Sequence, residues 1–361
     1  MSEVEAIGPV EARHGTGDTE AFVEAFVVEA RRDWPVFAIV AAYAGAAWLL
    51  CCLLGRLDYY HPLLYMPLSF GTMTTAAGAY VLLVEAPKAV IGEPRAPMTA
   101  LLRRLKARAH PEFLVSLGVF LAAGLFTSLF TCMKSLLNEV VPFRSDVALA
   151  KLDAALFLGH DPWRLLAPLL DNHPVVRVVQ NLYLTGWLLA LIGFVGAASF
   201  AKRLKPVRLR FFLTYFTAWV VLGNLVAAAF MSAGPAFFGA LTGDQSRYGG
   251  LLHHLAFSEG LPNSSVTLQQ MLWSSYTRHQ VEPGAGISAF PSLHVAMVTL
   301  FALTAFQLDR RLGWAMTIFA ATIFTGSVAL GWHYAADGLF SAGFVVAVWF
   351  GLGRLNPKPA A

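Results

Sequence analysis

The segment from Phe290 to Asp337 decides the fold, and it reads FPSLHVAMVTLFALTAFQLDRRLGWAMTIFAATIFTGSVALGWHYAAD. Within it, one short polar turn separates two apolar runs, each long enough to be predicted to cross a bilayer. His294 opens the first run and His333 closes the second. Asp337 follows His333 by four residues, a spacing that places both on one face of a helix. Ionisable groups at membrane depth are costly, so these three residues are functional candidates.

The composition of the whole chain indicates an integral membrane protein. Hydrophobic residues make up 57% of its 361 residues and charged residues 13%, and the mean hydropathy is +0.59. Soluble domains carry about 25% charged residues. The formal net charge is +4, and all three cysteines lie within apolar runs, which gives no sign of a disulfide framework. We therefore expect the bilayer as a partner, and no nucleic acid.

Eight stretches are apolar over roughly 20 residues and are predicted to span the membrane. The 34 residues at the start of the chain are polar, without the apolar core of a signal peptide. The last two spans are joined so tightly that the turn between them must lie at one membrane face. The predicted spans are Val36–Gly55, Pro62–Glu85, Glu112–Leu136, Val178–Phe200, Phe211–Met231, Phe290–Leu308, Gly313–Trp332 and Tyr334–Leu352.

The distribution of lysine and arginine predicts the orientation of these spans. Of the 26 basic residues, 18 fall in the two terminal tails and in the connections after the second, fourth and sixth spans. Connections rich in lysine and arginine stay in the cytoplasm. The other basic residues, together with His294, His333 and Asp337, then face the exoplasmic side, which is the periplasm if the chain lies in a bacterial inner membrane.

The spans divide the chain into four parts. We expect a cytoplasmic tail over 1–35, two additional helices with a basic connection over 36–111, a six-helix catalytic core over 112–353 and a cytoplasmic tail over 354–361. The core includes two long exoplasmic loops, 137–177 and 232–289. The first loop carries an amphipathic pattern over 146–157, which favours a helix lying on the surface. The sequence leaves the oligomeric state open.

Two motifs resemble signatures of the type 2 phosphatidic acid phosphatase superfamily. Pro291-Ser-Leu-His294 is similar to its Pro-Ser-x-His segment, and His333-Tyr-Ala-Ala-Asp337 to the end of its Ser-Arg-x5-His-x3-Asp segment. The remaining signature, Lys-x6-Arg-Pro, is visible from Lys134 to Pro142. Val141 and Ser327 occupy the two positions at which the superfamily has arginine.

The lost arginines and the His-Tyr-x-x-Asp motif resemble the inositol phosphorylceramide synthase-like branch of this superfamily. Sphingomyelin synthases share the same arrangement of two histidines and an aspartate. The resemblance covers roughly residues 112–352 and implies an all-helical membrane fold with a six-helix core. It also implies lipid head-group transfer in sphingolipid metabolism, and a phosphate-binding role for Lys134.

The groups themselves suggest a mechanism. Phosphoester cleavage needs a nucleophile, a proton donor for the leaving oxygen and positive charge around the phosphoryl oxygens. We predict that His333 is the nucleophile and forms a phosphohistidine, with Asp337 orienting it. His294 would protonate the leaving alkoxide and then deprotonate the acceptor, since an unperturbed histidine titrates at about pH 6.5. This scheme requires no metal and no other cofactor.

Several residues are candidates for holding the phosphate. Pro291 suits the first turn of a helix, so the backbone amides beside Ser292 would point at an anion and its hydroxyl would add a donor. Because two signature arginines are missing, further positive charge must come from the exoplasmic loops. Arg247 and Arg278 are the two candidates for this charge, and the sequence does not separate them; Arg144 lies on the same side.

Each candidate also has a purely structural interpretation. His294 can be a packing residue, Asp337 a helix cap and Lys134 a lysine that snorkels to the interface. The combination of the Pro-Ser context with the His333 and Asp337 pair favours the catalytic interpretation of the histidines. Another pair of residues, Tyr183 and Trp187, is interpreted as interfacial packing rather than as a substrate platform.

The sequence therefore predicts a membrane enzyme that cleaves a phospholipid donor at the exoplasmic face. The favoured reaction is transfer of an inositol-phosphate-like head group to a lipid or alcohol hydroxyl. The alternative is a lipid phosphatase that transfers to water, with phosphatidate or a polyprenyl pyrophosphate as substrate. A transporter with proton-relay histidines is a third class, disfavoured because the sequence shows no inverted repeat and no paired broken helices.

Overall fold

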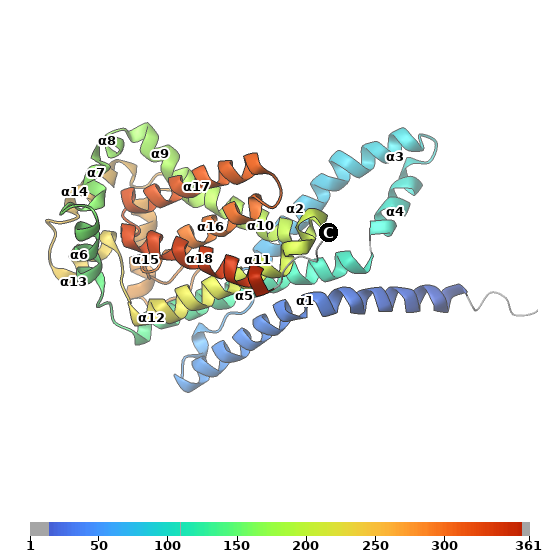
Figure 1. Cartoon of the computed structure of the whole chain (residues 1–361), viewed down its shortest axis with the longest axis horizontal. Helices are drawn as coiled ribbons and strands as arrows, with labels where there is room; N and C mark the ends of the chain where they lie inside the picture. Colours follow the sequence, from blue (N-terminus) through green and yellow to red (C-terminus); the bar gives the residue numbers. More distant parts are fainter. Residues whose placement is uncertain (1–13, 109, 356–361) are drawn as a thin grey trace, which may run out of the picture.

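The computed structural model describes residues 14–108 and 110–355, which form a bundle of long helices with short helices at one end (Figure 1). No strand occurs in these two ranges. The predicted all-helical membrane fold is therefore confirmed.

In the part of the chain that the structure describes, seven helical segments are long and apolar enough to cross a membrane. In several of these segments, a π-helical stretch connects two α-helices. The segments are Glu20–Leu53 in α1 (His14–Leu53), Met66–Gly92 with α2 (Met66–Tyr80) and α3 (Ala86–Gly92), α5 (Pro111–Val140), His173–Phe200 with α9 (His173–Asn181) and α10 (Trp187–Phe200), Lys202–Ala229 with α11 (Arg208–Thr217) and α12 (Ala227–Ala229), α17 (Arg310–Ala329), and Ala335–Arg354 in α18 (Ala335–Leu355).

The remaining predicted span, Phe290–Leu308, is wrong in its length. Helix α16 covers only Leu293–Ala305, 13 residues, or about 20 Å, whereas the hydrocarbon core is about 30 Å thick. The helix starts at Leu293 because the backbone of Ser292 is extended and its hydroxyl caps the first turn, accepting from the N–H of Val295. Pro291 thus lies before the helix and not in its first turn as the sequence predicted. Most side chains of α16 are buried between neighbouring helices, so it is an internal helix of the bundle.

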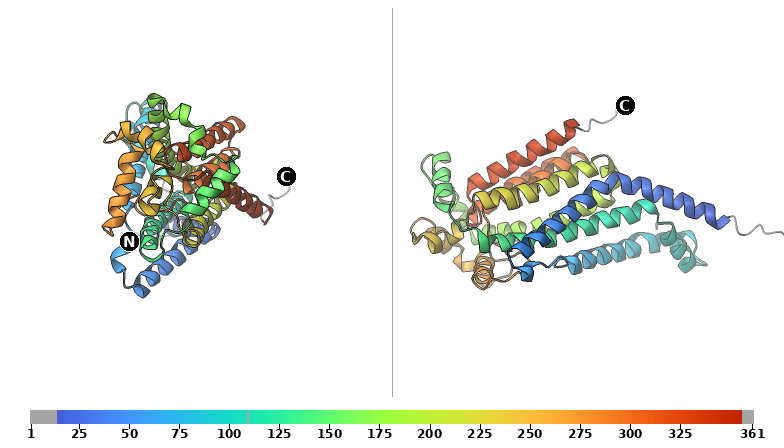
Figure 2. Two further views of the ribbon diagram at one scale, coloured as in Figure 1. Left: turned by 90° about the vertical axis from the view of Figure 1, so that its left-hand side faces the viewer. Right: turned by 90° about the horizontal axis from the view of Figure 1, so that it is seen from below.

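The short helices gather at one end of the bundle, on the left in Figure 1. The N-terminal end of α1 and the C-terminal end of α18 lie at the opposite end of the bundle, together with α4 (Pro97–Arg108) (Figure 1 and Figure 2). The segments predicted as exoplasmic loops thus share one end, and basic segments predicted as cytoplasmic share the other. The helices at the loop end are α6 (Asp146–Leu156), α7 (Pro162–Leu165), α8 (Ala167–Leu170), α13 (Phe238–Thr242), α14 (Gly249–Leu255) and α15 (Ser265–Thr277).

A buried ion pair ties α1 to the bundle at the basic end. The Arg208 guanidinium lies 2.7 Å from a carboxylate oxygen of Asp33, and both residues are almost fully buried. The other N–H groups of Arg208 donate to the carbonyl oxygens of Ala198 and Ser199 and to the hydroxyl of Ser116. All three guanidinium nitrogens are thus partnered, whereas the second carboxylate oxygen of Asp33 has no hydrogen-bond partner among the described residues. The pairing of the guanidinium makes its burial compatible with a stable fold.

Candidate active site

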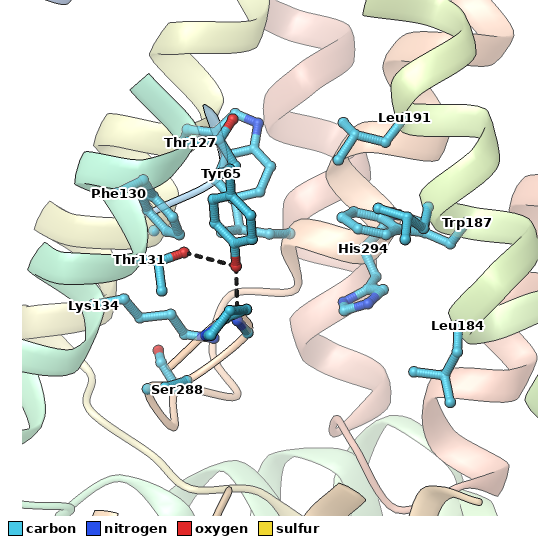
Figure 3. A pocket seen from close by; sticks show the side chains of 18 of the residues that line it. Tyr65, Thr127, Phe130, Thr131, Lys134, Leu184, Trp187, Leu191, Ser288 and His294 are labelled. Atoms are coloured by element: carbon cyan, nitrogen blue, oxygen red, sulfur yellow. Dashed lines mark hydrogen bonds between the residues drawn. The ribbon is translucent and has the colours of Figure 1, made fainter. Parts of the chain in front are cut away.

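A cavity of about 630 Å³ lies between α2, α5, α10 and α16, and it reaches the loop end of the bundle (Figure 3). Lys134, His294 and His333 line its polar end, while the lining farther along α5 and α10 is apolar as far as Phe120 and Val195. The stretch of α5 between Lys134 and Phe120 corresponds to about 20 Å of helix. The cavity therefore joins a small polar chamber to a long apolar channel.

His333 sits in the turn between α17 and α18, and its side chain is buried at the cavity wall. Its Nδ1 atom lies 2.7 Å from the carbonyl oxygen of Ala289, which can only accept a hydrogen bond. This contact places the imidazole hydrogen on Nδ1 and leaves Nε2 as the free, basic nitrogen. Burial lowers the pKa of His333 to about 3, although the hydrogen bond to Ala289 opposes the shift. The imidazole is thus neutral at physiological pH, the form a nucleophile requires.

Asp337 lies in the first turn of α18 and is fully buried. One carboxylate oxygen accepts a hydrogen bond from the N–H of Tyr334 and lies 3.4 Å from Nδ1 of His333. The other oxygen has no hydrogen-bond partner among the described residues. Asp337 therefore combines the two roles that the sequence offered for it, a helix cap and a neighbour of the histidine.

His294 lies in the first turn of α16, and its ring stacks on Tyr183, with 4.6 Å between ring centroids. Trp187 packs on the same imidazole at 4.3 Å, and its indole N–H donates to the backbone carbonyl of His294. The centroids of His294 and His333 are 6.1 Å apart. The two imidazoles thus lie close together on the wall of one cavity.

Tyr183 and Trp187 were interpreted from the sequence as interfacial packing, and the structure corrects that interpretation. Both residues line the cavity and hold the ring of His294. The signal was their spacing of four residues, which does place them on one helical face. The sequence could not tell which helix that face contacts.

Lys134 projects from α5 into the cavity on the side opposite His294 (Figure 3). A Cβ atom at Gly286, whose φ is +88°, would lie 2.9 Å from the Lys134 Cγ and 3.0 Å from its backbone carbonyl carbon. Only glycine therefore lets this loop pass so close to the lysine. Lys134 forms no ion pair or hydrogen bond with another described side chain, so its ammonium group is available for an anion.

The other predicted phosphate-binding residues lie elsewhere. Ser292 is fully buried, and its hydroxyl is used to cap α16. Both arginines lie outside the cavity lining. Arg247 is paired with Asp161 at 2.6 Å and donates to the carbonyl of Ala150, while Arg278 is exposed and donates to the hydroxyl of Ser274. The structure thus brings together Lys134 and the two histidines, and neither of these arginines.

Two buried carboxylates of α6 hold the His333 turn from outside the cavity, and sequence reasoning missed both. Asp153 accepts hydrogen bonds from the backbone N–H groups of Ala335 and Ala336, which start α18. Asp146 accepts from the hydroxyl of Tyr334 and from two backbone N–H groups of the loop 232–289. The amphipathic pattern over 146–157 predicted a helix lying on the surface and gave no sign that its aspartates are buried.

Within residues 14–108 and 110–355, no group of three or more His, Cys, Asp or Glu side chains is arranged to hold a metal ion. The chemistry that the described groups offer is that of two imidazoles, one of them oriented by a hydrogen bond, beside one amine side chain. This set can attack a phosphorus atom, protonate a leaving oxygen and neutralise a phosphoryl oxygen.

A helical membrane bundle with two histidines and an aspartate at the mouth of an apolar channel defines an integral membrane enzyme acting on lipid phosphoesters. The chain belongs to the PAP2 superfamily, whose family model matches residues 147–351. It is therefore a phosphatase or phosphotransferase of that superfamily. No curated protein and no solved structure matches the chain.

Proposed function

We propose that this enzyme transfers the phosphoryl head group of a phosphodiester lipid to a lipid hydroxyl, as in the inositol phosphorylceramide synthase-like branch that it resembles. The observation that carries the proposal is the charge of the cavity. Lys134 is the one lysine or arginine among the described residues that line it. A phosphodiester carries less negative charge than a terminal phosphomonoester and so needs fewer cations.

The two histidines divide the reaction into two steps. In the first, Nε2 of His333 attacks phosphorus, a P–N bond forms, and the P–O bond to the diacylglycerol oxygen breaks as His294 donates its proton to that oxygen. In the second, His294 takes the proton of the acceptor hydroxyl, whose oxygen attacks phosphorus while the P–N bond breaks. Lys134 lies where it can neutralise a phosphoryl oxygen in both steps.

The roof of the cavity supports transfer over hydrolysis. A cluster of apolar side chains borders the cavity, with Phe237 stacked on Trp273 at 5.3 Å and Ile287 buried in the same cluster; Phe237 and Ile287 line the cavity. A transferase gains from excluding water until an acceptor hydroxyl arrives. A lipid acceptor can reach the chamber through the apolar channel without crossing water.

The proposed site faces the exoplasmic side of the membrane. The histidines lie at the end where the short helices gather, and the lysine- and arginine-rich connections lie at the other end. Positively charged connections are retained in the cytoplasm. This distribution supports an exoplasmic active site, which is periplasmic if the membrane is a bacterial inner membrane.

The test is a donor and acceptor panel with the purified enzyme in detergent. Labelled phosphatidylinositol, phosphatidate and a polyprenyl pyrophosphate are each incubated with and without a long-chain alcohol. We expect the phosphodiester to be the best donor and the alcohol to divert label into a new lipid. Release of inorganic phosphate from a monoester or pyrophosphate, unaffected by the alcohol, would instead establish a lipid phosphatase.

A further inference from the structure

Helix α2 lies outside the residues matched by the family model, yet it forms one wall of the cavity. The cavity lining includes three residues of α2, namely Leu68, Ser69 and Thr72, and also Tyr65, which immediately precedes the helix. The matched residues begin only at position 147. The second membrane helix is therefore more than an appendage to the catalytic core.

The hydroxyl of Tyr65 ties α2 to the glycine-rich loop that borders the polar chamber. It accepts a hydrogen bond of 2.7 Å from the backbone N–H of Gly284 and one of 3.3 Å from the hydroxyl of Thr131 on α5 (Figure 3). The backbone N–H of Tyr65 donates to the hydroxyl of Ser128, also on α5, at 2.9 Å. Because both its backbone and its ring are fixed to α5, Tyr65 is a firm anchor for the loop.

The loop that Tyr65 holds contacts both the lysine and the nucleophilic histidine of the proposed mechanism. Gly286 packs against Lys134, and the carbonyl of Ala289 receives the hydrogen bond of His333. Between them, the side-chain amide of Asn138 holds the backbone of Ile287: it donates to the carbonyl oxygen and accepts from the N–H, both at 2.6 Å. The position of Gly284 is thus connected, over five residues, to the placement of the lysine and to the tautomer of the histidine.

The rest of α2 separates the apolar channel from the bilayer as a thin wall. None of its residues is buried, and it approaches α5 closely where Ser69 faces Gly124. A Cβ atom at Gly124 would collide with the hydroxyl of Ser69, so the glycine permits this approach. A helix with one side on a cavity and the other exposed is placed to set the width of that cavity.

We infer that α2 completes the active site, with Tyr65 as a positioning residue for the glycine-rich loop and Thr72 as part of the wall that selects the lipid chain. This inference rests on the proposed function for its kinetic part. Its structural part, the hold of Tyr65 on the loop, is independent of any substrate.

The positioning role is tested with Tyr65→Phe and with Tyr43→Phe as the matched control, since the Tyr43 hydroxyl bonds Asn224 away from the loop. Hydrogen–deuterium exchange of the peptide over residues 281–290 should rise in Tyr65→Phe and stay unchanged in Tyr43→Phe. The kcat of Tyr65→Phe should fall about three- to tenfold, as for one lost hydrogen bond, with little change in KM. Unchanged exchange would overturn the anchor, and raised exchange with an unchanged kcat would overturn the positioning role.

The wall is tested with Thr72→Phe and with Thr74→Phe, an exposed neighbour on the same helix that does not line the cavity. Thr72→Phe should lower kcat/KM for a long-chain donor by about tenfold or more relative to a short-chain donor. Thr74→Phe should leave this ratio unchanged, and equal ratios in the two variants would overturn the wall. If the wild-type enzyme turns over no lipid phosphoester, the proposed function fails, while hydrogen exchange still decides whether Tyr65 holds the loop.

Discussion

The Nδ1 atom of His333 lies 2.7 Å from the carbonyl oxygen of Ala289, a residue 44 positions earlier in the chain. The carboxylate that the sequence predicted to orient this histidine, that of Asp337, lies farther away at 3.4 Å. Either group can hold the hydrogen on Nδ1. The closer partner is a backbone carbonyl, which no side-chain substitution removes.

Replacing Asp337 by asparagine should therefore slow donor cleavage only roughly 10- to 100-fold, the usual effect of losing a residue that supports a reacting one. In a serine protease triad, where the carboxylate alone fixes the tautomer, the corresponding loss is about 10⁴. The measurement is the single-turnover rate with a labelled phosphodiester lipid. A loss as large as the protease value would show that the Ala289 carbonyl does not substitute for the carboxylate.

Acidification should destabilise the wild-type protein more than a His333→Asn variant. The pKa of His333 is lowered by burial to about 3 in the folded state, whereas an unperturbed histidine has a pKa of about 6.5. Below the unfolded value, the unfolded chain binds a proton that the folded chain refuses, so stability falls as the pH drops toward the folded value. The thermal midpoints of both proteins in detergent at pH 7 and pH 4.5 measure this. Equal shifts in the two proteins would mean that His333 titrates normally.

Removing the buried guanidinium with Arg208→Met should destabilise the protein by about 3–5 kcal/mol, because Asp33 is left buried without its partner. The matched control is Arg103→Met, whose ion pair with Glu93 is mostly exposed and should be worth less than about 1 kcal/mol. Thermal unfolding in detergent compares the two. Equal midpoints would mean that the junction between α1 and the bundle contributes little.

The orientation of the chain predicts which introduced cysteines can be labelled from outside intact cells. With Cys51, Cys52 and Cys132 replaced, a cysteine at Thr242 should react with an impermeant thiol reagent, since it lies on the short helix α13. A cysteine at Ala107, in α4 at the other end of the bundle, should react only after permeabilisation. The reverse pattern would place the histidines on the cytoplasmic side.

The sequence predicted those site residues that belong to short sequence motifs. His294 follows a proline and a capping serine, so local rules are sufficient to place it at a helix end. The spacing of His333 and Asp337 predicted one helical face, but His333 lies in the turn before α18 and only Asp337 lies in that helix. The all-helical fold followed from apolar runs of spanning length. The run at α16 has enough apolar residues, but its extended capping serine starts the helix only at Leu293.

The parts that the sequence could not predict depend on contacts between distant segments. Tyr65 and Gly284 are 219 positions apart, and Asp146 and Tyr334 are 188 apart. Arg247 was a reasonable phosphate ligand until the structure placed Asp161 beside it. Net charge and membrane side constrain such a residue, but only the packing of the loops decides which anion it contacts.

The central claim is that Nε2 of His333 attacks a phosphodiester lipid, and trapping the intermediate tests it most directly. The His294→Ala enzyme, which should break down the intermediate slowly, is mixed with phosphatidylinositol, quenched at alkaline pH and digested for mass spectrometry. We predict an acid-labile adduct on His333 that carries the inositol-phosphate group, and no adduct in the His333→Ala enzyme. An adduct on another residue, or turnover that persists in His333→Ala, would contradict the account.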